Sequence, residues 1–236
     1  MKTKKRVVVG TEAINARIQR MLIARAKYEA DLPSAHVKLM KGNSKTGANC
    51  YTVSLCPIID CVNCSECRKD CYDIQHDVIY KQVVDSRACN SAICRKDKPR
   101  YWAEISQQVK ALFVTELRLN VGGDLDDEDF AFVSLVAEEN PRCDILFFTK
   151  NYKGINTYLD NHKFPQNVKA IMSAWKEMPM NNPHNLPVAH VLWEDGTTTA
   201  PEYGSYYCGG NCSACHFNAE GCWTLKNGES VIFKAH

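Results

Sequence analysis

The sequence lacks a strong excess of charge of either sign, because 29 Lys and Arg residues stand against 27 Asp and Glu residues, a formal net charge of +2. No overall electric field therefore favours nucleic acid or a membrane as partner. The apolar run in MKTKKRVVVG is too short for the core of a secretory signal, and no small-residue cleavage site follows it. Repeats and low-complexity tracts are also missing. These absences predict a cytoplasmic protein without a membrane segment.

Cysteine, by contrast, is abundant, with 13 residues in a chain of 236. An odd number of cysteines without a secretion signal argues against a disulfide framework and favours thiolate ligands in a reducing compartment. Six of them lie between residues 50 and 71, and four lie between residues 208 and 222. The two groups predict two metal sites, or one site built from both ends of the chain. Three cysteines stand apart: Cys89, Cys94 and Cys143.

The first group contains the run DCVNCSECRKDCYD, with cysteines at the spacing C-x2-C-x2-C-x3-C. This is the spacing of the bacterial ferredoxin run, although Tyr72 stands where that run has a proline. Short spacings let one loop wrap a compact inorganic core. The pattern favours a [4Fe-4S] cluster; a structural zinc site and uncoordinated thiols remain alternatives, since zinc also binds C-x2-C pairs. The four candidate ligands are Cys61, Cys64, Cys67 and Cys71.

The second group, YYCGGNCSACHFNAEGCW, begins with the spacing C-x3-C-x2-C that radical S-adenosylmethionine enzymes use. In those enzymes the motif precedes the barrel that it serves, whereas only 21 residues follow Cys215 here. A fourth cysteine, Cys222, is in place to close the site. We interpret the group as a fully ligated auxiliary cluster or a structural zinc site, with His216 a weaker candidate. The candidate ligands are Cys208, Cys212, Cys215 and Cys222.

The periodicity of apolar residues predicts an α/β fold. Residues 11–30 have helical spacing, with Thr11 as a candidate N-cap, and Asp31-Leu-Pro ends the helix. A strand is predicted at 51–55, and two helices between Tyr72 and Val114, divided near Lys98-Pro99. Strands and helices then alternate, which predicts parallel βαβ units in a sheet or partial barrel. The expected strands lie in 112–121, 143–150, 168–175 and 186–196, and the intervening helices in 125–141 and 153–164.

The loops that follow parallel strands gather at one edge of the sheet, where ligands bind. Four such loops carry candidate residues: Gly122-Gly123-Asp124, Thr149-Lys150, Ser173-Ala174-Trp175 and Trp193-Glu194-Asp195. Close backbone approach to a ligand is one interpretation of the glycine pair, with Asp124 accepting from an amine or a hydroxyl. A tight turn with Asp124 near a helix N-terminus is the alternative, which the sequence alone favours. Lys150 is a candidate for contact with a phosphate or a carboxylate, or is simply solvated.

Acidic residues 126–129 permit a different interpretation, in which adjacent carboxylates hold Mg²⁺ in a nuclease. Acids in the first turn of a helix explain them more simply. The aromatic residues are expected mostly in the core, and no basic and aromatic residues alternate densely enough to indicate nucleic-acid binding.

With these motifs in view, the chain resembles the bacteriophage "gene product 88" family. The resemblance runs from about Ser44 to the C-terminus and leaves the N-terminal helix outside. It rests on elements that recur in order: SKTG, YTVSL, C-x3-C-Y at residues 67–72, the strand ending in GD at 123–124, FTK at 148–150, SAW at 173–175, LPVAHV, GNC-x2-C and CW at 210–223, and a closing V-x-F-x-x-H.

This resemblance implies an iron–sulfur protein similar in plan to radical S-adenosylmethionine enzymes: a parallel (β/α) partial TIM-like barrel with a cysteine loop at 50–71. The implied division is an N-terminal helical extension at 1–43, the partial barrel at 44–200 and a cysteine-rich metal-binding segment at 201–236. Gly122, Gly123, Asp124 and Ser173 would contact S-adenosylmethionine, and Asp124 and Lys150 are the catalytic candidates.

Departures from the radical-enzyme pattern keep other functions open. The first group lacks the C-x3-C-x2-C spacing, so an iron with an open coordination position is not assured, and Cys50, Cys56 and Cys64 are additional to the family pattern. One alternative is a non-enzymatic module, stabilised by iron–sulfur or zinc, that binds nucleic acid or a host protein. A metal-dependent nuclease is the other. A phage origin would place the protein in the bacterial host cytoplasm.

Overall fold

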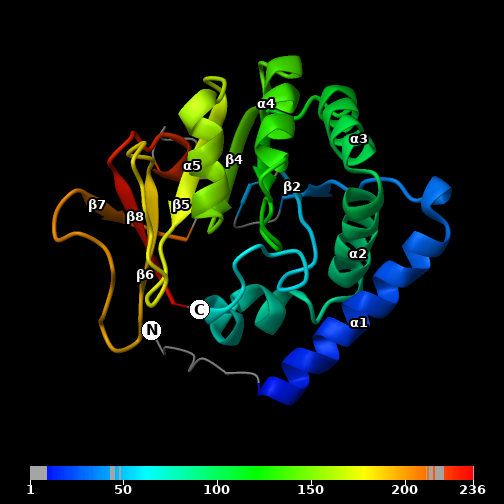
Figure 1. The fold of residues 1–236 in the computed structure, drawn as a ribbon, viewed down its shortest axis with the longest axis horizontal. Helices are drawn as coiled ribbons and strands as arrows, with labels where there is room; N and C mark the ends of the chain where they lie inside the picture. The colour runs from blue at the N-terminus through cyan, green and yellow to red at the C-terminus, as the bar shows by residue number, and fades with distance from the viewer. Residues whose placement is uncertain are drawn as a thin grey trace.

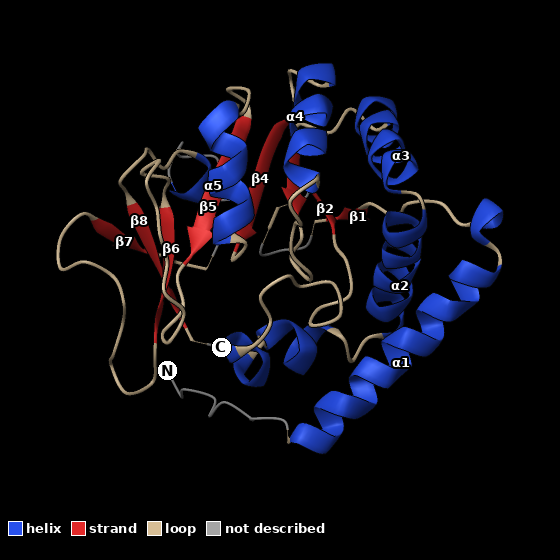
Figure 2. Cartoon of the chain, viewed as in Figure 1, coloured by secondary structure: helices blue, strands red, loops and turns tan. Residues whose placement is uncertain are grey.

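The computed structural model describes residues 10–42, 46–47, 49–210, 212, 215 and 221–235, without the side chains of 76 and 77. Five α-helices and eight strands make up its regular structure (Figures 1 and 2). The helices are α1 (Thr11–Ala30), α2 (Lys81–Lys96), α3 (Lys98–Ala111), α4 (Asp129–Glu139) and α5 (Tyr152–Asn161). The strands are β1 (Met40–Lys41), β2 (Cys50–Val53), β3 (Glu116–Leu119), β4 (Asp144–Thr149), β5 (Val168–Ser173), β6 (Val188–Leu192), β7 (Ser205–Tyr207) and β8 (Ser230–Lys234).

The eight strands form one mixed sheet in the order β1-β2-β3-β4-β5-β6-β8-β7. All neighbouring pairs are parallel except β1 with β2. From β2 to β6 the spatial order follows the chain order, as repeated βαβ units require. No pairing joins β1 to β7 in the described part of the chain, so the sheet is open. The expected α/β fold with a mostly parallel sheet is confirmed, whereas the expected partial TIM-like barrel is not.

The central strands bury both faces. Leu117, Phe147 and Met172 belong to the main core, which α3, α4 and α5 cover on one face of the sheet (Figure 1). The alternate residues Leu146 and Ile171 lie on the other face, in a smaller core. We call this second surface the inner face. Residues of the C-terminal segment pack on it, including Tyr206, Cys208, Cys222, Trp223 and Leu225.

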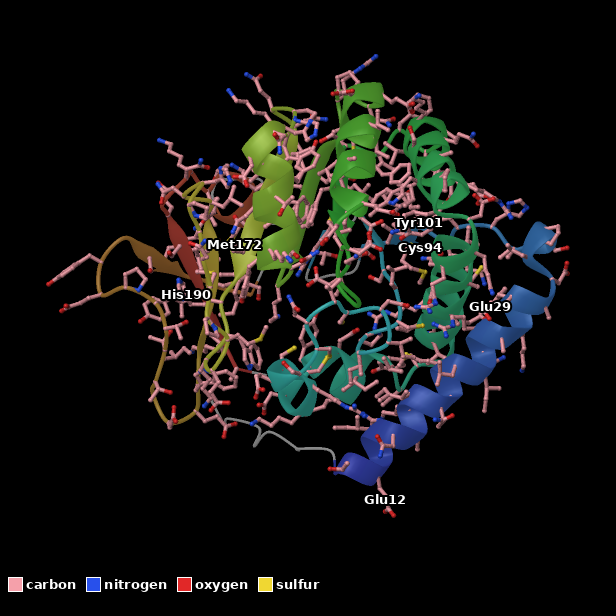
Figure 3. The ribbon with its side chains drawn as sticks, in the orientation of Figure 1. Glu12, Glu29, Cys94, Tyr101, Met172 and His190 are labelled. Carbon is pink, nitrogen blue, oxygen red and sulfur yellow. The ribbon has the colours of Figure 1, made fainter. Side chains whose placement is uncertain are left out.

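Helix α1 packs along α2 (Figure 1). Its buried side chains Ile14 and Met21 join Ile74 and Val84 in a second core, while Glu12 and Glu29 mark its two ends (Figure 3). The helix spans the expected residues, but Gly10 rather than Thr11 is the N-cap, and no side chain caps it. Among the described helices, none combines the length and the apolar character needed to cross a bilayer.

The sequence predictions for the other elements agree with the structure within a few residues at each end, with one exception. Helix α2 begins at Lys81 rather than near Tyr72, because a short π-helix at Asp73–Asp77 and a turn precede it. Strands β1, β7 and β8 were not predicted. Strands β1 and β7 contain only two and three residues, too few to show a period of two. Strand β8 is the short apolar run SVIFK, a pattern that the sequence alone cannot distinguish from loop or helix.

Candidate functional site

The C-terminal ends of β2 to β6 lie at one edge of the sheet, because these strands are parallel. The four loops that carry the predicted site residues therefore meet at this edge. The cysteine loop follows β2 directly and extends past the same strand ends, in cyan below the sheet in Figure 1. The edge thus brings the first cysteine group, the 122–124 turn and Lys150 into one region.

Backbone hydrogen bonds fasten the cysteine loop to the loops beside it. The Leu55 amide donates to the Gly122 carbonyl at 2.9 Å, and the Asp124 amide donates to the Asp60 carbonyl at 2.9 Å. Further along, the Asn63 side chain donates to the carbonyl of Lys150 at 2.8 Å. The loop is therefore joined to the ends of both β3 and β4.

Three thiols of the loop lie close together, with the thiol of Cys64 in contact with the other two. Cys64 shares side-chain hydrogen bonds with Cys61 and Cys67, and these raise the pKa of Cys64. The same contact with Cys64 lowers the pKa of Cys67 to about 7, and the charge of Lys150 acts in the same direction. Burial raises the pKa of Cys71 to about 12, with electrostatic contributions from Asp73 and Cys61. All four predicted ligands of the first group thus lie within one loop region.

Local backbone strain occurs beside these thiols. Ile58 adopts φ of 70°, a left-handed conformation that a β-branched residue rarely takes. Its amide donates to the sulfur of Cys61 at 3.3 Å. Strain of this kind persists only where the surrounding structure enforces it, and it concentrates at functional sites.

Asp124 is buried in the turn that connects the strand ends. Its carboxylate accepts from the amide of Leu125 at 2.8 Å and from the amide of Lys150 at 2.9 Å. Burial raises the pKa of Asp124, while the hydrogen bond from Lys150 opposes that change. These contacts agree with the interpretation as a structural turn, which the sequence favoured. Asp124 holds the end of β3 against the end of β4.

The two glycines of this turn are required by close packing. A Cβ at residue 122 would lie 2.2 Å from the carboxylate of Asp73 and 2.9 Å from the guanidinium of Arg87. Gly123 has φ of +81°, and a Cβ there would lie 2.7 Å from Cβ of Leu55. The turn therefore approaches the cysteine loop more closely than any side chain at these positions would allow.

Gly123→Ala is expected to lower the free energy of unfolding by more than the cost of its backbone conformation alone, which is about 1–2 kcal/mol. Gly196 provides the matched control, because it has the same φ of +81° and a Cβ there would meet nothing within 4 Å. Urea unfolding of both alanine variants measures the difference. Equal losses would show that the contact with Leu55 does not constrain the turn.

Lys150 extends from the end of β4 toward the aromatic side chains that follow β5 and β6. Its ammonium lies 5.2 Å from the ring centroid of Trp175. The rings of Trp175 and Trp193 pack edge to face, with their centroids 4.8 Å apart. Lys176 lies 4.3 Å from the ring of Trp193. Ser173 is the last residue of β5, and its carbonyl accepts from the Tyr152 hydroxyl at 2.6 Å. The edge beside Cys67 thus combines positive charge with aromatic faces.

The second cysteine group lies in a different place. All four of its cysteines line a cavity of about 30 Å³ on the inner face of the sheet. No thiol of residues 61–71 lines this cavity in the described part of the chain, so the two groups form separate sites. His216 lies outside the described residues. The remaining walls come from Thr46, Cys50, Arg118, Leu146, Phe148, Tyr206, Trp223 and Phe233.

The sequence grouping counted Cys50 with the first cysteine group, but Cys50 lines the cavity of the second group. Arg118 lines the same cavity, and the sequence interpretation missed it. Burial raises the pKa of Cys50 to about 12, while Arg118 favours its charged form. Burial likewise raises the pKa of Cys222 to about 11, again with Arg118 opposing. The alternation Glu-Leu-Arg-Leu in β3 contains a signal for Arg118, because its two leucines belong on the helix-covered face and its polar residues on the other.

The acidic run at 126–129 is held by basic and amide groups on the helix side. Lys98 forms ion pairs with three of its carboxylates, and Asp127 accepts from the Asn151 side chain at 2.8 Å. Burial raises the pKa of Asp129 to about 6. Asp129 also begins α4, in agreement with the interpretation as helix-start acids. The three partners of Lys98 are Asp126, Glu128 and Asp129.

Four other cysteines are buried, and their surroundings are those of core residues. Cys56 contacts the second core. The other three belong to the main core: Cys89, Cys94 and Cys143. Figure 3 shows Cys94 close to Tyr101 beside α2 and α3, and the phenol and the thiol interact electrostatically. None of the four lines the cavity of the C-terminal cysteines.

No group of three or more His, Cys, Asp or Glu side chains in the described ranges has the geometry of a preformed metal site. Bound metal would therefore require movement of the thiols in either group. Metal binding would also require the thiols to lose their protons.

Fold and sites together define an α/β protein with an open, mostly parallel sheet and two separate cysteine-rich regions. A family model for "Gene product 88" matches residues 14–229, and the chain belongs to this family. The match begins inside α1, so most of the N-terminal helix falls within the family, unlike the range of the resemblance above. Comparison with curated proteins gave no match, and comparison with solved structures gave none.

Proposed function

We propose that this protein is an iron–sulfur protein of radical S-adenosylmethionine type, with a [4Fe-4S] cluster on the 61–71 loop. The observation that carries the proposal is the order of the loops at the sheet edge. The cysteine loop follows the first parallel strand, β2, and the Gly122-Gly123-Asp124 turn follows the next, β3. This arrangement is similar to the partial barrel that the sequence resemblance implies.

The donor set suits a thiophilic cluster. Soft thiolates select iron–sulfur clusters and zinc, whereas carboxylates suit magnesium and calcium. Cys61, Cys64 and Cys67 are already neighbours, and Cys71 interacts with Cys61. Tyr72, next to the last of these cysteines, donates to the Val121 carbonyl at 3.2 Å and so joins the loop to the turn. When bound, a [4Fe-4S] cluster would supply the electron that cleaves S-adenosylmethionine.

The surrounding residues would bind and orient that cofactor. Lys150 brings a positive charge toward Cys67, which would offset the negative charge of thiolate ligands. Asp124 fixes the turn through the amides of Leu125 and Lys150, so the cofactor would contact backbone groups of Gly122 and Gly123. Ser173 and Trp175, from the end of β5, would form the opposite wall of the site.

One observation favours a second function, a non-enzymatic module with a structural metal. Cys64 contacts both Cys61 and Cys67, so four thiolates are available to coordinate every position of a zinc ion or a cluster. A fully coordinated site leaves no position for S-adenosylmethionine. Such a module would act by binding nucleic acid or a host protein, and the Lys150, Trp175 and Trp193 group at the same edge is the surface that we would expect to be used.

For the second cysteine group we propose a single metal ion, zinc, rather than a further cluster. The supporting observation is the small cavity of about 30 Å³, which has room for an ion or an ordered water molecule. Four thiolates in a closed tetrahedral set are typical of structural zinc. The candidate ligands remain Cys208, Cys212, Cys215 and Cys222.

The enzyme and the module are distinguished by incubating the anaerobically purified protein with dithionite and S-adenosylmethionine. An enzyme of the proposed type yields methionine and 5′-deoxyadenosine, with dithionite as the electron source and a substrate or solvent hydrogen completing the product. Heat-denatured protein is the control. An intact cluster in which every iron is coordinated by cysteine, together with no formation of 5′-deoxyadenosine, would favour the module. A colourless protein that contains two zinc ions and no iron would contradict the enzyme.

A further inference from the structure

The cavity at the C-terminal cysteines contains one cation from the sheet. Arg118 is the only Lys or Arg among the described residues that line it. Strand β3 directs Arg118 to the inner face, while its neighbours Leu117 and Leu119 are buried in the main core. The guanidinium carbon lies 5.1 Å from the ring centroid of Phe148, a cation–π contact that holds the side chain against the sheet.

Arg118 carries a buried donor whose needs the described protein groups do not meet. Its Nε is shielded from solvent and has no hydrogen-bond partner among the residues that the structure describes. A buried donor without a partner costs free energy, and the cost is larger when the group is charged. Native structures satisfy such groups in nearly all cases, and an exception calls for a physical explanation.

The surrounding chemistry supplies an explanation. A zinc ion with four thiolate ligands carries excess negative charge in an apolar cavity walled by Leu146, Phe148 and Phe233. Buried charge of this kind is stable only when it is paired or hydrogen-bonded. Arg118 interacts electrostatically with Cys222 of the C-terminal group and with Cys50 of β2, so its charge acts on a thiol of the C-terminal segment and on a thiol of the sheet.

We infer that Arg118 is the positioning residue of the C-terminal metal site, donating a hydrogen bond to a metal-bound thiolate and offsetting its charge. This inference rests on the proposed zinc site. Metal binding would then fasten the C-terminal segment to the inner face of the sheet, because Arg118 belongs to β3. The segment and the sheet then form one unit in the metal-bound protein, and separate more easily without the metal.

The test measures how fast a chelator removes zinc from the full-length protein. Arg118→Met removes the charge with little change in size, and Arg118→Lys retains a charge. The control is Arg142→Met, which changes an exposed arginine on the loop before β4. If the time course of zinc release has several phases, the phase that is lost in Cys222→Ala belongs to the C-terminal site. We expect release from it to be 10–100 times faster in Arg118→Met, partly restored in Arg118→Lys and unchanged in Arg142→Met.

Stability of the metal-free protein separates this role from simple packing. Removing a buried donor that has no partner should leave metal-free Arg118→Met at least as resistant to urea as metal-free wild type, whereas a packing role would weaken both forms. If Arg118→Met binds zinc and releases it as slowly as wild type does, the inference about Arg118 is wrong, although the zinc site is still supported. Absence of any phase that Cys222→Ala removes would overturn the zinc site and the inference together.

Discussion

Cys67→Ala is expected to remove the iron held by the 61–71 loop, leaving little absorbance near 400 nm in anaerobically purified protein. Cys67 is one of the expected ligands, because its thiol contacts that of Cys64 and interacts with the charge of Lys150. Its loss would leave the cluster with a missing thiolate or force a rearrangement of the loop. Iron and sulfide analysis of the purified variant, referred to protein concentration, provides the measurement.

Cys89→Ala is the matched control for this prediction. Cys89 belongs to neither cysteine group. It is fully buried in the main core, and its thiol donates to the carbonyl of His36 at 3.2 Å. The iron content of the Cys89→Ala variant should equal that of wild type. Full iron content in Cys67→Ala would contradict the assignment of the cluster to this loop, and loss of iron in both variants would indicate a general effect on folding.

Arg87→Met is expected to destabilise the protein by about 3–5 kcal/mol, because it leaves a buried carboxylate without its guanidinium. Arg87 lies in α2 and forms a buried ion pair with Asp73, which follows the last cysteine of the loop by two residues. Gly122 packs directly against this pair. The pair therefore connects α2, the cysteine loop and the 122–124 turn, and urea unfolding of the metal-free protein measures its contribution.

Arg95→Met is the control for Arg87→Met. Arg95 is half exposed and lies 3.6 Å from the carboxylate of Asp60, which Arg25 also approaches at 3.7 Å. A partly exposed pair of this kind contributes about 1 kcal/mol or less. Addition of Asp73→Asn to Arg87→Met should recover part of the lost stability, since it removes the uncompensated charge. Similar, small losses in both single variants would contradict a buried pair at Arg87.

Much of the fold follows from patterns in the sequence. The alternation of apolar strands with amphipathic helices predicts parallel βαβ units, and the strands from β2 to β6 lie in that order in the sheet. Closure of a barrel depends on how the last strands pair, and β7 and β8 pair at the open end of the sheet. Short strands carry too little periodicity for that pairing to be predicted.

The candidate sites were predictable to different degrees. Because parallel strand ends meet at one edge, the gathering of the 122–124 turn and Lys150 beside the cysteine loop could be expected. The separation of the two cysteine groups could not, since it depends on the path of the chain after β6. The contribution of Cys50 and Arg118 to the C-terminal cavity was also missed, because residues far apart in sequence meet there only through the strand register.

The most direct test of the proposed function is the Mössbauer spectrum of the ⁵⁷Fe-enriched protein, purified without oxygen, combined with its EPR spectrum after reduction. We expect a [4Fe-4S] cluster on the 61–71 loop, with one iron whose signal changes when S-adenosylmethionine is added. The same sample of Cys67→Ala should lack that cluster. A wild-type protein that contains zinc and no iron at this loop would contradict the central claim.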